Sequence, residues 1–295
     1  MHRDLRTPNR GRILRTATVG GVAALVLTGC ASSELPGNPT WKTGWLPSTA
    51  DTTDHTSIII NLWNGTWVTA WIVGILTWGL MIWCMIAYRR RKGDTGLPVQ
   101  LRYHLPLEIL YTIVPIMMVG VLFVFTARDM ATVTEVDPAK TDVEIEVVGK
   151  RWAWDFNYDY NDPAQAVYET SEQVALDGSD QAVPTLYLPV DQTVTLRLES
   201  RDVIHSFWVP GFLYKEDMIP GRTNYYQFTP TKEGIYAGKC AELCGEYHSE
   251  MIFQVAVVSQ AEYDNQLKAL ADKGQKGRLE VNLGRSKNLT QEGEQ

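Results

Sequence analysis

The sequence predicts a two-helix transmembrane hairpin followed by an all-β sandwich domain. Two uncharged apolar runs point to the hairpin: residues 56–88 and residues 109–127 contain no Asp, Glu, Lys or Arg. Short stretches beyond residue 128 point to the sandwich, because they alternate apolar and polar residues and are separated by Gly and Pro. The chain has 295 residues, a length that suits about two domains.

The first 29 residues are predicted to be a lipoprotein-type signal peptide. They hold five arginines and a single acid ahead of a short apolar run, which is the order of a secretory signal. The run ends in LTGC at residues 27–30, which resembles the bacterial lipobox, so Cys30 is predicted to be lipidated and to become the mature N-terminus. An ordinary signal peptide with a chance Cys is the alternative. Residues 30–55 are predicted to form an irregular extracytoplasmic tether.

The hairpin is predicted over residues 56–127, with spans at about 66–88 and 109–127. At about 1.5 Å per residue, each span can cross a hydrocarbon layer of roughly 30 Å. A buried core helix is the alternative, although such a helix rarely lacks a polar face for so long. The loop at 89–108 begins with RRRK, a basic cluster expected on the cytoplasmic side. The chain is therefore predicted to be a multi-pass protein of the cell membrane with both long tails outside the cytoplasm.

Residues 128–260 are predicted to form an antiparallel sandwich or barrel outside the cytoplasm. Aromatic residues recur at every second position from Trp152 to Tyr160, so one face of a strand is expected to be aromatic. Residues 261–271 are predicted to form a closing helix, and the polar remainder to Gln295 is expected to be a loose tail. Alternation predicts further strands at 142–148, 193–198, 225–229 and 252–258.

The charge of the chain is concentrated in this second half. The whole chain has 27 basic and 34 acidic residues, a net charge of -7. From residue 128 onward there are 16 basic and 28 acidic residues, a net charge of -12. Such acidity argues against nucleic acid as a partner, because binding to phosphates depends on basic patches. A basic partner is the natural inference, although solubility alone also explains an acidic surface.

One short stretch concentrates metal-binding side chains. Cys240, Cys244, His248 and Met251 lie within twelve residues, and His205 lies 35 residues upstream. Soft thiolate and thioether ligands combined with imidazole favour copper, and one Cys with two His and a weak Met is typical of an electron-transfer copper site. The additional Cys240 indicates a second thiolate that can bridge to a second metal and share one electron between the two ions.

Two other kinds of site are compatible with this stretch. Two cysteines outside the cytoplasm can form a disulfide, and two Cys with two His can hold structural zinc. A structural zinc site would leave Met251 without a role, and a disulfide would leave both histidines without one. The full set of five side chains therefore favours copper.

The chain resembles subunit II of haem-copper cytochrome c oxidases over roughly residues 56–258, and its amino-terminal signal resembles those of Gram-positive bacteria, including actinobacteria. The resemblance rests on the hairpin followed by a β domain and on four motifs. These motifs are Trp152-Ala-Trp154, Asp202-Val-Ile-His205-Ser-Phe, Asp217-Met-Ile-Pro-Gly-Arg222 and Cys240-x3-Cys244-x3-His248-x2-Met251.

The resemblance implies a cupredoxin fold that holds a dinuclear copper centre, called CuA. It implies that the two cysteines bridge the coppers, that the two histidines cap them, and that the Met and one backbone carbonyl are weak ligands. The implied ligands are His205, Cys240, Cys244, His248, Met251 and the carbonyl of Glu242. The side chain of Glu242 is implied to reach a magnesium ion shared with subunit I.

The resemblance gives other residues roles as well. Trp152 matches the aromatic residue through which electrons enter from cytochrome c, with a packed core Trp as the alternative. Glu108 matches an acid at the cytoplasmic mouth of a proton channel, with an ordinary carboxylate at a helix end as the alternative. Asp202 and Asp217 are expected either to orient the copper loop or to meet subunit I, and the sequence leaves that choice open.

The function implied is that of cytochrome c oxidase subunit II. It accepts single electrons from a c-type cytochrome and passes them to haem in subunit I, where oxygen reduction and proton pumping take place. Subunits I and III and a cytochrome bc–oxidase supercomplex are the implied partners. No Cys-x-x-Cys-His motif is present, so no haem is expected in this chain.

Three other classes of protein share parts of this pattern. A quinol oxidase subunit II shares the hairpin and the fold but lacks the copper ligands. Nitrous oxide reductase carries a similar copper centre without a two-helix anchor. A membrane-tethered copper chaperone could use Cys, His and Met, but it needs neither the aromatic strand nor the charged ends of the hairpin.

Overall fold

A computed structural model describes residues 46–48, 51–93, 96–97, 100–159, 161–162, 164–170 and 183–281. These residues all belong to one compact unit, Pro39–Gln295. The predicted signal peptide, Cys30, most of the predicted tether and the last fourteen residues lie outside the described residues, as does Tyr160. The described end of the predicted tether contacts the sandwich, because Thr53 pairs with Pro230 and the Asp54 amide donates to the Thr229 carbonyl over 3.1 Å.

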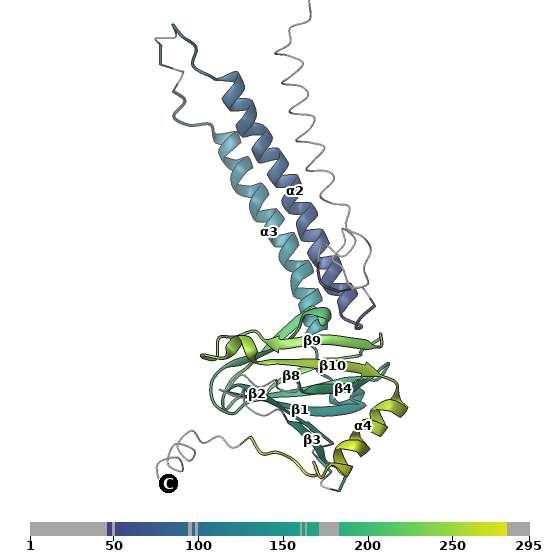
Figure 1. Ribbon diagram of the computed structural model, residues 1–295. Helices are drawn as coiled ribbons and strands as arrows, with labels where there is room; N and C mark the ends of the chain where they lie inside the picture. Colours follow the sequence, from purple (N-terminus) through teal and green to yellow (C-terminus); the bar gives the residue numbers. More distant parts are fainter. Residues whose placement is uncertain are drawn as a thin grey trace, which may run out of the picture. The chain divides into compact units, whose positions relative to one another are not determined.

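Two long helices form the hairpin, α2 (Thr56–Ala87) and α3 (Leu105–Val133), shown in blue and teal in Figure 1. Within the described part of the chain, these are the two helices long and apolar enough to cross a membrane. Helix α2 begins ten residues before the predicted span of 66–88 and ends one residue short of it, whereas α3 extends beyond the predicted span of 109–127 at both ends. Apolar composition marks the stretch suited to lipid, whereas backbone hydrogen bonds and caps determine where a helix begins and ends.

The first turn of α3 shows how such an end is made. The His104 imidazole Nδ1 accepts a hydrogen bond from the Leu107 amide over 3.3 Å, and the Glu108 carboxylate accepts one from the His104 amide over 2.9 Å. This reciprocal pair resembles a capping box: it gives the His104 amide a side-chain acceptor and adds a second acceptor for the Leu107 amide, which also donates to the His104 carbonyl over 2.9 Å. Pro106 follows the cap, where its missing N–H costs nothing.

In the part of the chain that the structure describes, ten strands make two five-stranded sheets that pack face to face (Figure 1). The strand orders are β3-β2-β1-β5-β8 in one sheet and β4-β10-β9-β6-β7 in the other. The bounds are β1 Val143–Lys150, β2 Ala153–Tyr158, β3 Val167–Thr170, β4 Thr185–Pro189, β5 Val194–Ser200, β6 His205–Val209, β7 Tyr214–Met218, β8 Asn224–Phe228, β9 Gly234–Cys240 and β10 Ile252–Val258. In the described residues, a 3₁₀ helix at Pro138–Lys140 precedes β1, and two others, at Pro210–Phe212 and His248–Glu250, connect strands.

The prediction of a purely antiparallel sandwich was wrong for two strand pairs. β1 runs parallel to β5 and β10 runs parallel to β4, while the other pairs are antiparallel. Alternation along a strand reports which face is buried but carries no information on the direction of the neighbouring strand. Both parallel pairs join strands separated by other elements of the chain, which leaves room for the crossover that parallel pairing requires.

The aromatic strand supplies much of the core. Trp154, Phe156 and Tyr158 on β2 are fully buried, as the period of two predicted. Each such side chain contributes about 1.5–3 kcal/mol when it leaves water. Trp152 does not belong to this strand: it lies in the turn between β1 and β2 and is half-buried.

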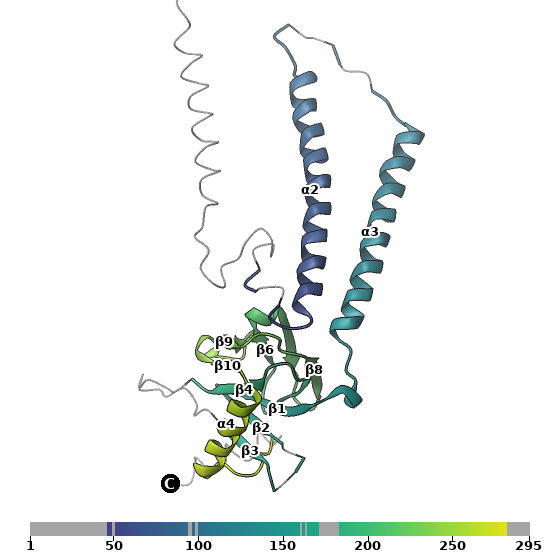
Figure 2. The same ribbon diagram turned by 90° about the vertical axis from the view of Figure 1, so that its right-hand side faces the viewer.

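The last described elements pack against strands of both sheets. Helix α4 (Gln260–Asp272) begins at a Ser259 cap and lies beside β3 and β4 (Figure 2). The segment beyond α4 was predicted to be loose, but its described part is held to the sheet. Arg278 forms an ion pair with the fully buried Glu146, and the Leu279 amide donates to the Asn157 side chain over 2.9 Å. A buried carboxylate requires such a partner, and the composition of the segment does not predict this ion pair.

Candidate metal centre

The predicted ligands come together where two neighbouring strands end. His205 is the first residue of β6 and Cys240 is the last of β9. These strands are antiparallel neighbours, with Phe207 opposite Cys240. The Cys240 amide donates to the Met251 carbonyl over 3.0 Å, which closes the loop that carries the remaining ligands. The sheet therefore brings His205 to a loop that lies 35 residues further along the chain.

Six donor atoms converge in this loop. The Cys240 and Cys244 sulfurs lie 4.0 Å apart. His205 Nδ1 is 3.8 Å from the Cys240 sulfur, and His248 Nδ1 is 3.5 Å from the Cys244 sulfur. The remaining two donors are the Met251 sulfur, 3.8 Å from the Cys244 sulfur, and the Glu242 carbonyl oxygen, 3.2 Å from the Cys240 sulfur. Three of these residues, His205, Cys240 and Cys244, form a buried group able to hold a metal ion.

Burial and mutual repulsion control the ionisation of the two thiols. Burial raises the pKa of Cys244 to about 12, and the neighbouring Cys240 adds to this effect. Burial alone would also raise the pKa of Cys240, but hydrogen bonds from His205 and from the backbone lower it below its ordinary value. Two thiolates 4.0 Å apart repel each other, so a cation between them is needed for both to be ionised together. The donor set and its charges therefore fit a soft metal ion.

The Nε2 side of the His205 imidazole, opposite the nitrogen that faces Cys240, is enclosed by protein. Its ring is fully buried, and its Nε2 lies 2.9 Å from the Asp202 carboxylate. Burial alone would lower the pKa of His205, but hydrogen bonding to Asp202 and Cys240 raises it above its ordinary value. Gly149 of β1 faces the ring, and a Cβ at that position would lie 3.1 Å from His205 Cδ2. Sequence reasoning missed Gly149, although a glycine inside a strand often marks a close approach of this kind.

The remaining ligands are fixed in different ways. Met251 is buried, and its carbonyl accepts a hydrogen bond of 3.4 Å from the Trp154 indole. Glu242 directs its carbonyl oxygen to Cys240 while its side chain is exposed. The carbonyl and the carboxylate of Glu242 therefore face different surroundings, as two separate roles require.

Trp152 lies directly against the metal-binding loop. Gly245 has a positive φ of 133°, and a Cβ there would be 3.0 Å from the Trp152 ring. The ring also meets Tyr247 edge to face with 5.0 Å between the centroids. Trp152 packs against the edge of the core as well. Sequence reasoning missed Gly245, whose lack of a side chain admits the indole.

The other predicted site residues lie elsewhere. Glu108 caps α3 and is far along the chain from the metal-binding loop. Asp217 is exposed on β7, whereas Asp202 contacts His205. Cys240 and Cys244 are free thiols rather than a disulfide. Cys30 lies outside the described residues.

Comparisons with known proteins agree with this architecture. The family model described as "Cytochrome C oxidase subunit II, periplasmic domain" matches residues 143–258. The chain is 40% identical to a probable cytochrome c oxidase subunit 2 of Streptomyces avermitilis, covering 96% of this chain and 94% of the relative. It is 32% identical to the cytochrome c oxidase subunit 2 of Corynebacterium diphtheriae, over 90% and 87% of the two chains.

A solved structure is also similar. The periplasmic domain of subunit II of cytochrome oxidase of Bradyrhizobium japonicum is 31% identical, with a TM-score of 0.40 over 45% of this chain and 96% of that one. The family assignment rests on the full-length relatives, whose identity extends over the hairpin and the sandwich alike. The chain belongs to the cytochrome c oxidase subunit 2 family and is thus a subunit of a haem-copper oxidase.

Proposed function

We propose that this subunit holds a dinuclear copper centre of the CuA type, accepts single electrons from a c-type cytochrome and delivers them to haem in subunit I. The observation that carries the proposal is the convergence of two thiols, two imidazole nitrogens, a thioether and a carbonyl around the loop at residues 240–251. Thiolate and thioether donors select copper over hard cations, and a thioether is unexpected in a zinc site.

Each donor then has a role in holding the metal. The Cys240 and Cys244 thiolates would bridge two copper ions, and Nδ1 of His205 and of His248 would cap them. The Met251 sulfur and the Glu242 carbonyl would be weak ligands. When bound, such a centre supplies a one-electron redox site shared between two ions.

The protein contributes a rigid and dry enclosure. Cys240, Cys244, Met251 and His205 are all buried, so water has little access to the donors. Strand ends and the bond between the Cys240 amide and the Met251 carbonyl fix the loop at both sides. A site whose donors cannot move changes little when its charge changes, which keeps the cost of electron transfer low.

Trp152 is the proposed point at which electrons enter. It is half-buried and contacts the loop through Gly245 and Tyr247. Its surroundings favour a basic donor, because the loop from 240 to 251 carries three exposed glutamates and no Lys or Arg. These glutamates are Glu242, Glu246 and Glu250.

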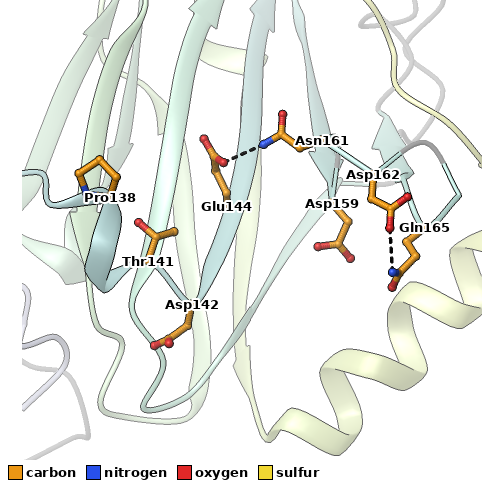
Figure 3. Close-up of a pocket in the computed structure, with 8 residues that line it drawn as sticks. All are labelled: Pro138, Thr141, Asp142, Glu144, Asp159, Asn161, Asp162 and Gln165. Atoms are coloured by element: carbon orange, nitrogen blue, oxygen red, sulfur yellow. Dashed lines mark hydrogen bonds between the residues drawn. The ribbon is translucent and has the colours of Figure 1, made fainter.

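A second acidic surface lies further away. Asp142, Glu144, Asp159 and Asp162 line a depression of about 460 Å³ (Figure 3). It sits where β1 begins, whereas Trp152 follows the end of that eight-residue strand, roughly 26 Å away at the usual rise. Burial and the neighbouring Asp162 raise the pKa of Asp159. This surface adds to the negative field that attracts a basic donor but is not adjacent to Trp152.

The other family roles complete the proposal. The exposed Glu242 carboxylate would bind a magnesium ion shared with subunit I, and Glu108 would stand at a proton channel of that subunit. Capping of α3 explains the position of Glu108 without a channel, so a functional role requires a test. Cys30 would carry a lipid anchor on the outer side of the cell membrane. Subunits I and III and a cytochrome bc complex would be the partners.

Copper stoichiometry of the purified full chain tests the proposal most directly. We expect two copper ions per chain and the electron paramagnetic resonance spectrum of one unpaired electron shared between both. Cys240→Ser should abolish that spectrum. Cys84→Ser is the matched control, because Cys84 is exposed on α2 and should leave the spectrum unchanged. One bound zinc ion, or a disulfide between Cys240 and Cys244 in active protein, would refute the copper centre.

A further inference from the structure

One carboxylate joins the metal-binding His205 to the turn that carries Trp152. Asp202 Oδ1 lies 2.9 Å from His205 Nε2, and Asp202 Oδ2 accepts a hydrogen bond of 2.8 Å from the Arg151 amide. The Arg151 guanidinium Nε is 3.7 Å from the same Oδ2. The two oxygens of Asp202 therefore contact two different parts of the site.

We propose that Asp202 is a positioning residue that fixes His205 with Nδ1 directed at the cysteines and, through Arg151, holds Trp152 against the copper loop. This inference rests on the proposed copper centre, since it assigns a role to a residue behind one of its ligands. The sequence had left open whether Asp202 or Asp217 orients the loop, and the structure separates the two.

The first half of the role follows from the chemistry of imidazole. A neutral imidazole carries its proton on one nitrogen and a lone pair on the other. A carboxylate 2.9 Å from Nε2 favours the proton there and leaves the lone pair on Nδ1, the nitrogen that faces Cys240. His205 is 0% exposed, and Asp202 is the one side chain that hydrogen bonds to its Nε2 in the described part of the chain. Asp202 is thus the group that selects the tautomer able to bind metal.

The second half of the role, holding Trp152 in place, follows from the hydrogen bonds around Asp202. Arg151 precedes Trp152, so the bond from its amide to Asp202 fixes the backbone just before the indole. The Arg201 amide donates to the Gly149 carbonyl over 2.9 Å. The Asp202 carboxylate is itself held by the Val203 amide, which donates over 2.7 Å. Two hydrogen bonds therefore join the segment at 149–151, which leads to Trp152, to the segment at 201–202, which leads to His205.

Asp217 supplies a matched comparison. It lies on β7, its side chain is exposed, and its backbone carbonyl accepts a hydrogen bond from the Asn224 side chain. In the part of the chain that the structure describes, its carboxylate has no hydrogen-bonded partner of the kind that Asp202 has. A change at Asp217 removes the same charge from the same domain without touching His205 or Arg151.

The tautomer of His205 can be measured without copper. We would label the histidines and tryptophans of the full chain in detergent with ¹⁵N and record long-range ¹H–¹⁵N correlations of the metal-free protein. The wild type should show His205 as one tautomer with the proton on Nε2. Asp202→Ala should give a mixture of both tautomers and shift the indole resonance of Trp152, while Asp217→Asn should match the wild type in both signals.

Copper titration of the same proteins gives a second readout. Removing a carboxylate behind a metal-binding histidine costs roughly 10- to 100-fold in metal affinity, and we expect this loss in Asp202→Ala. If that variant fails to fold, Asp202→Asn, which keeps the shape but not the charge, should still bind copper more weakly than the wild type and show a changed tautomer balance. Asp217→Asn should bind copper as the wild type does.

The results separate the two proposals. A wild-type tautomer and wild-type affinity in the Asp202 variants, or an equal loss in Asp217→Asn, would overturn the positioning role. An unmoved Trp152 resonance would overturn its second half. Failure of the wild type to bind copper would instead refute the proposed function, while the tautomer of the metal-free protein would still decide whether Asp202 positions His205.

Discussion

The close approach of Gly149 to His205 makes a sharp prediction for the substitution Gly149→Ala. A Cβ at this position would lie 3.1 Å from His205 Cδ2 and 3.2 Å from its Cβ and Cγ, whereas ordinary contact begins near 3.4 Å. The ring would have to retreat by about 0.3 Å. It has little freedom to do so, because it is fully buried and Asp202 lies 2.9 Å from its other side.

Two measurable effects follow from this overpacking. Forcing an additional methyl group into a close-packed site costs about 1–3 kcal/mol, so the free energy of unfolding should fall by about that amount. The displaced imidazole should also weaken copper binding by roughly 10-fold, at the lower end of the range for groups that orient a ligand. Urea unfolding of the metal-free chain and copper titration measure the two effects separately.

A matched variant controls for the added methyl group itself. Gly96 has no atom within 4 Å of a Cβ built there, so Gly96→Ala should leave both measurements at wild-type values. The reasoning would be refuted if Gly149→Ala bound copper with wild-type affinity and lost less than about 0.5 kcal/mol, the scatter expected of an ordinary surface substitution.

Three further predictions concern other parts of the molecule. Met251→Leu conserves volume at a buried position and removes only a ligand proposed to be weak, so the redox potential should change while the copper content stays at two. Complete loss of copper would contradict the proposed role. Trp152→Ala should slow electron transfer from a c-type cytochrome without altering the copper spectrum. Trp208→Ala, on β6, is the control. Equal transfer rates in both variants would show that Trp152 only packs against the core. Arg278→Ala removes one partner of the fully buried Glu146 and should lower the free energy of unfolding by about 1–3 kcal/mol. The loss should be smaller than for an isolated buried pair, because the Asn157 side chain still donates to the Glu146 carboxylate. A variant as stable as the wild type would show that this ion pair does not stabilise the fold.

The limits of sequence reasoning are clearest at the ends of elements. The uncharged run at 109–127 located the second helix, but α3 continues through Arg128 and Asp129 to Val133. Charged residues at a helix end do not stop the backbone from hydrogen bonding. The alternation from Trp152 onward located β2, yet Trp152 itself lies in the turn. A period of two cannot reveal where a strand stops, because a turn residue can match the same parity.

The sequence by itself determined which donor side chains the site contains. Cys240, Cys244, His248 and Met251 lie within twelve residues, so chain connectivity alone keeps their donor atoms near one another, and their types favour copper. The apolar runs likewise required a hairpin suited to a membrane, because uncharged stretches of that length have few other stable surroundings.

Only the tertiary structure decided how that chemistry is assembled. The pairing of β6 with β9 brings His205 to the loop, and the turn after β5 places Asp202, rather than Asp217, behind it. The packing of β1 leaves room for the His205 ring only because residue 149 is a glycine. Each of these contacts joins residues far apart in the chain, and their register depends on the burial of both sheets at once, which no local pattern of residues contains.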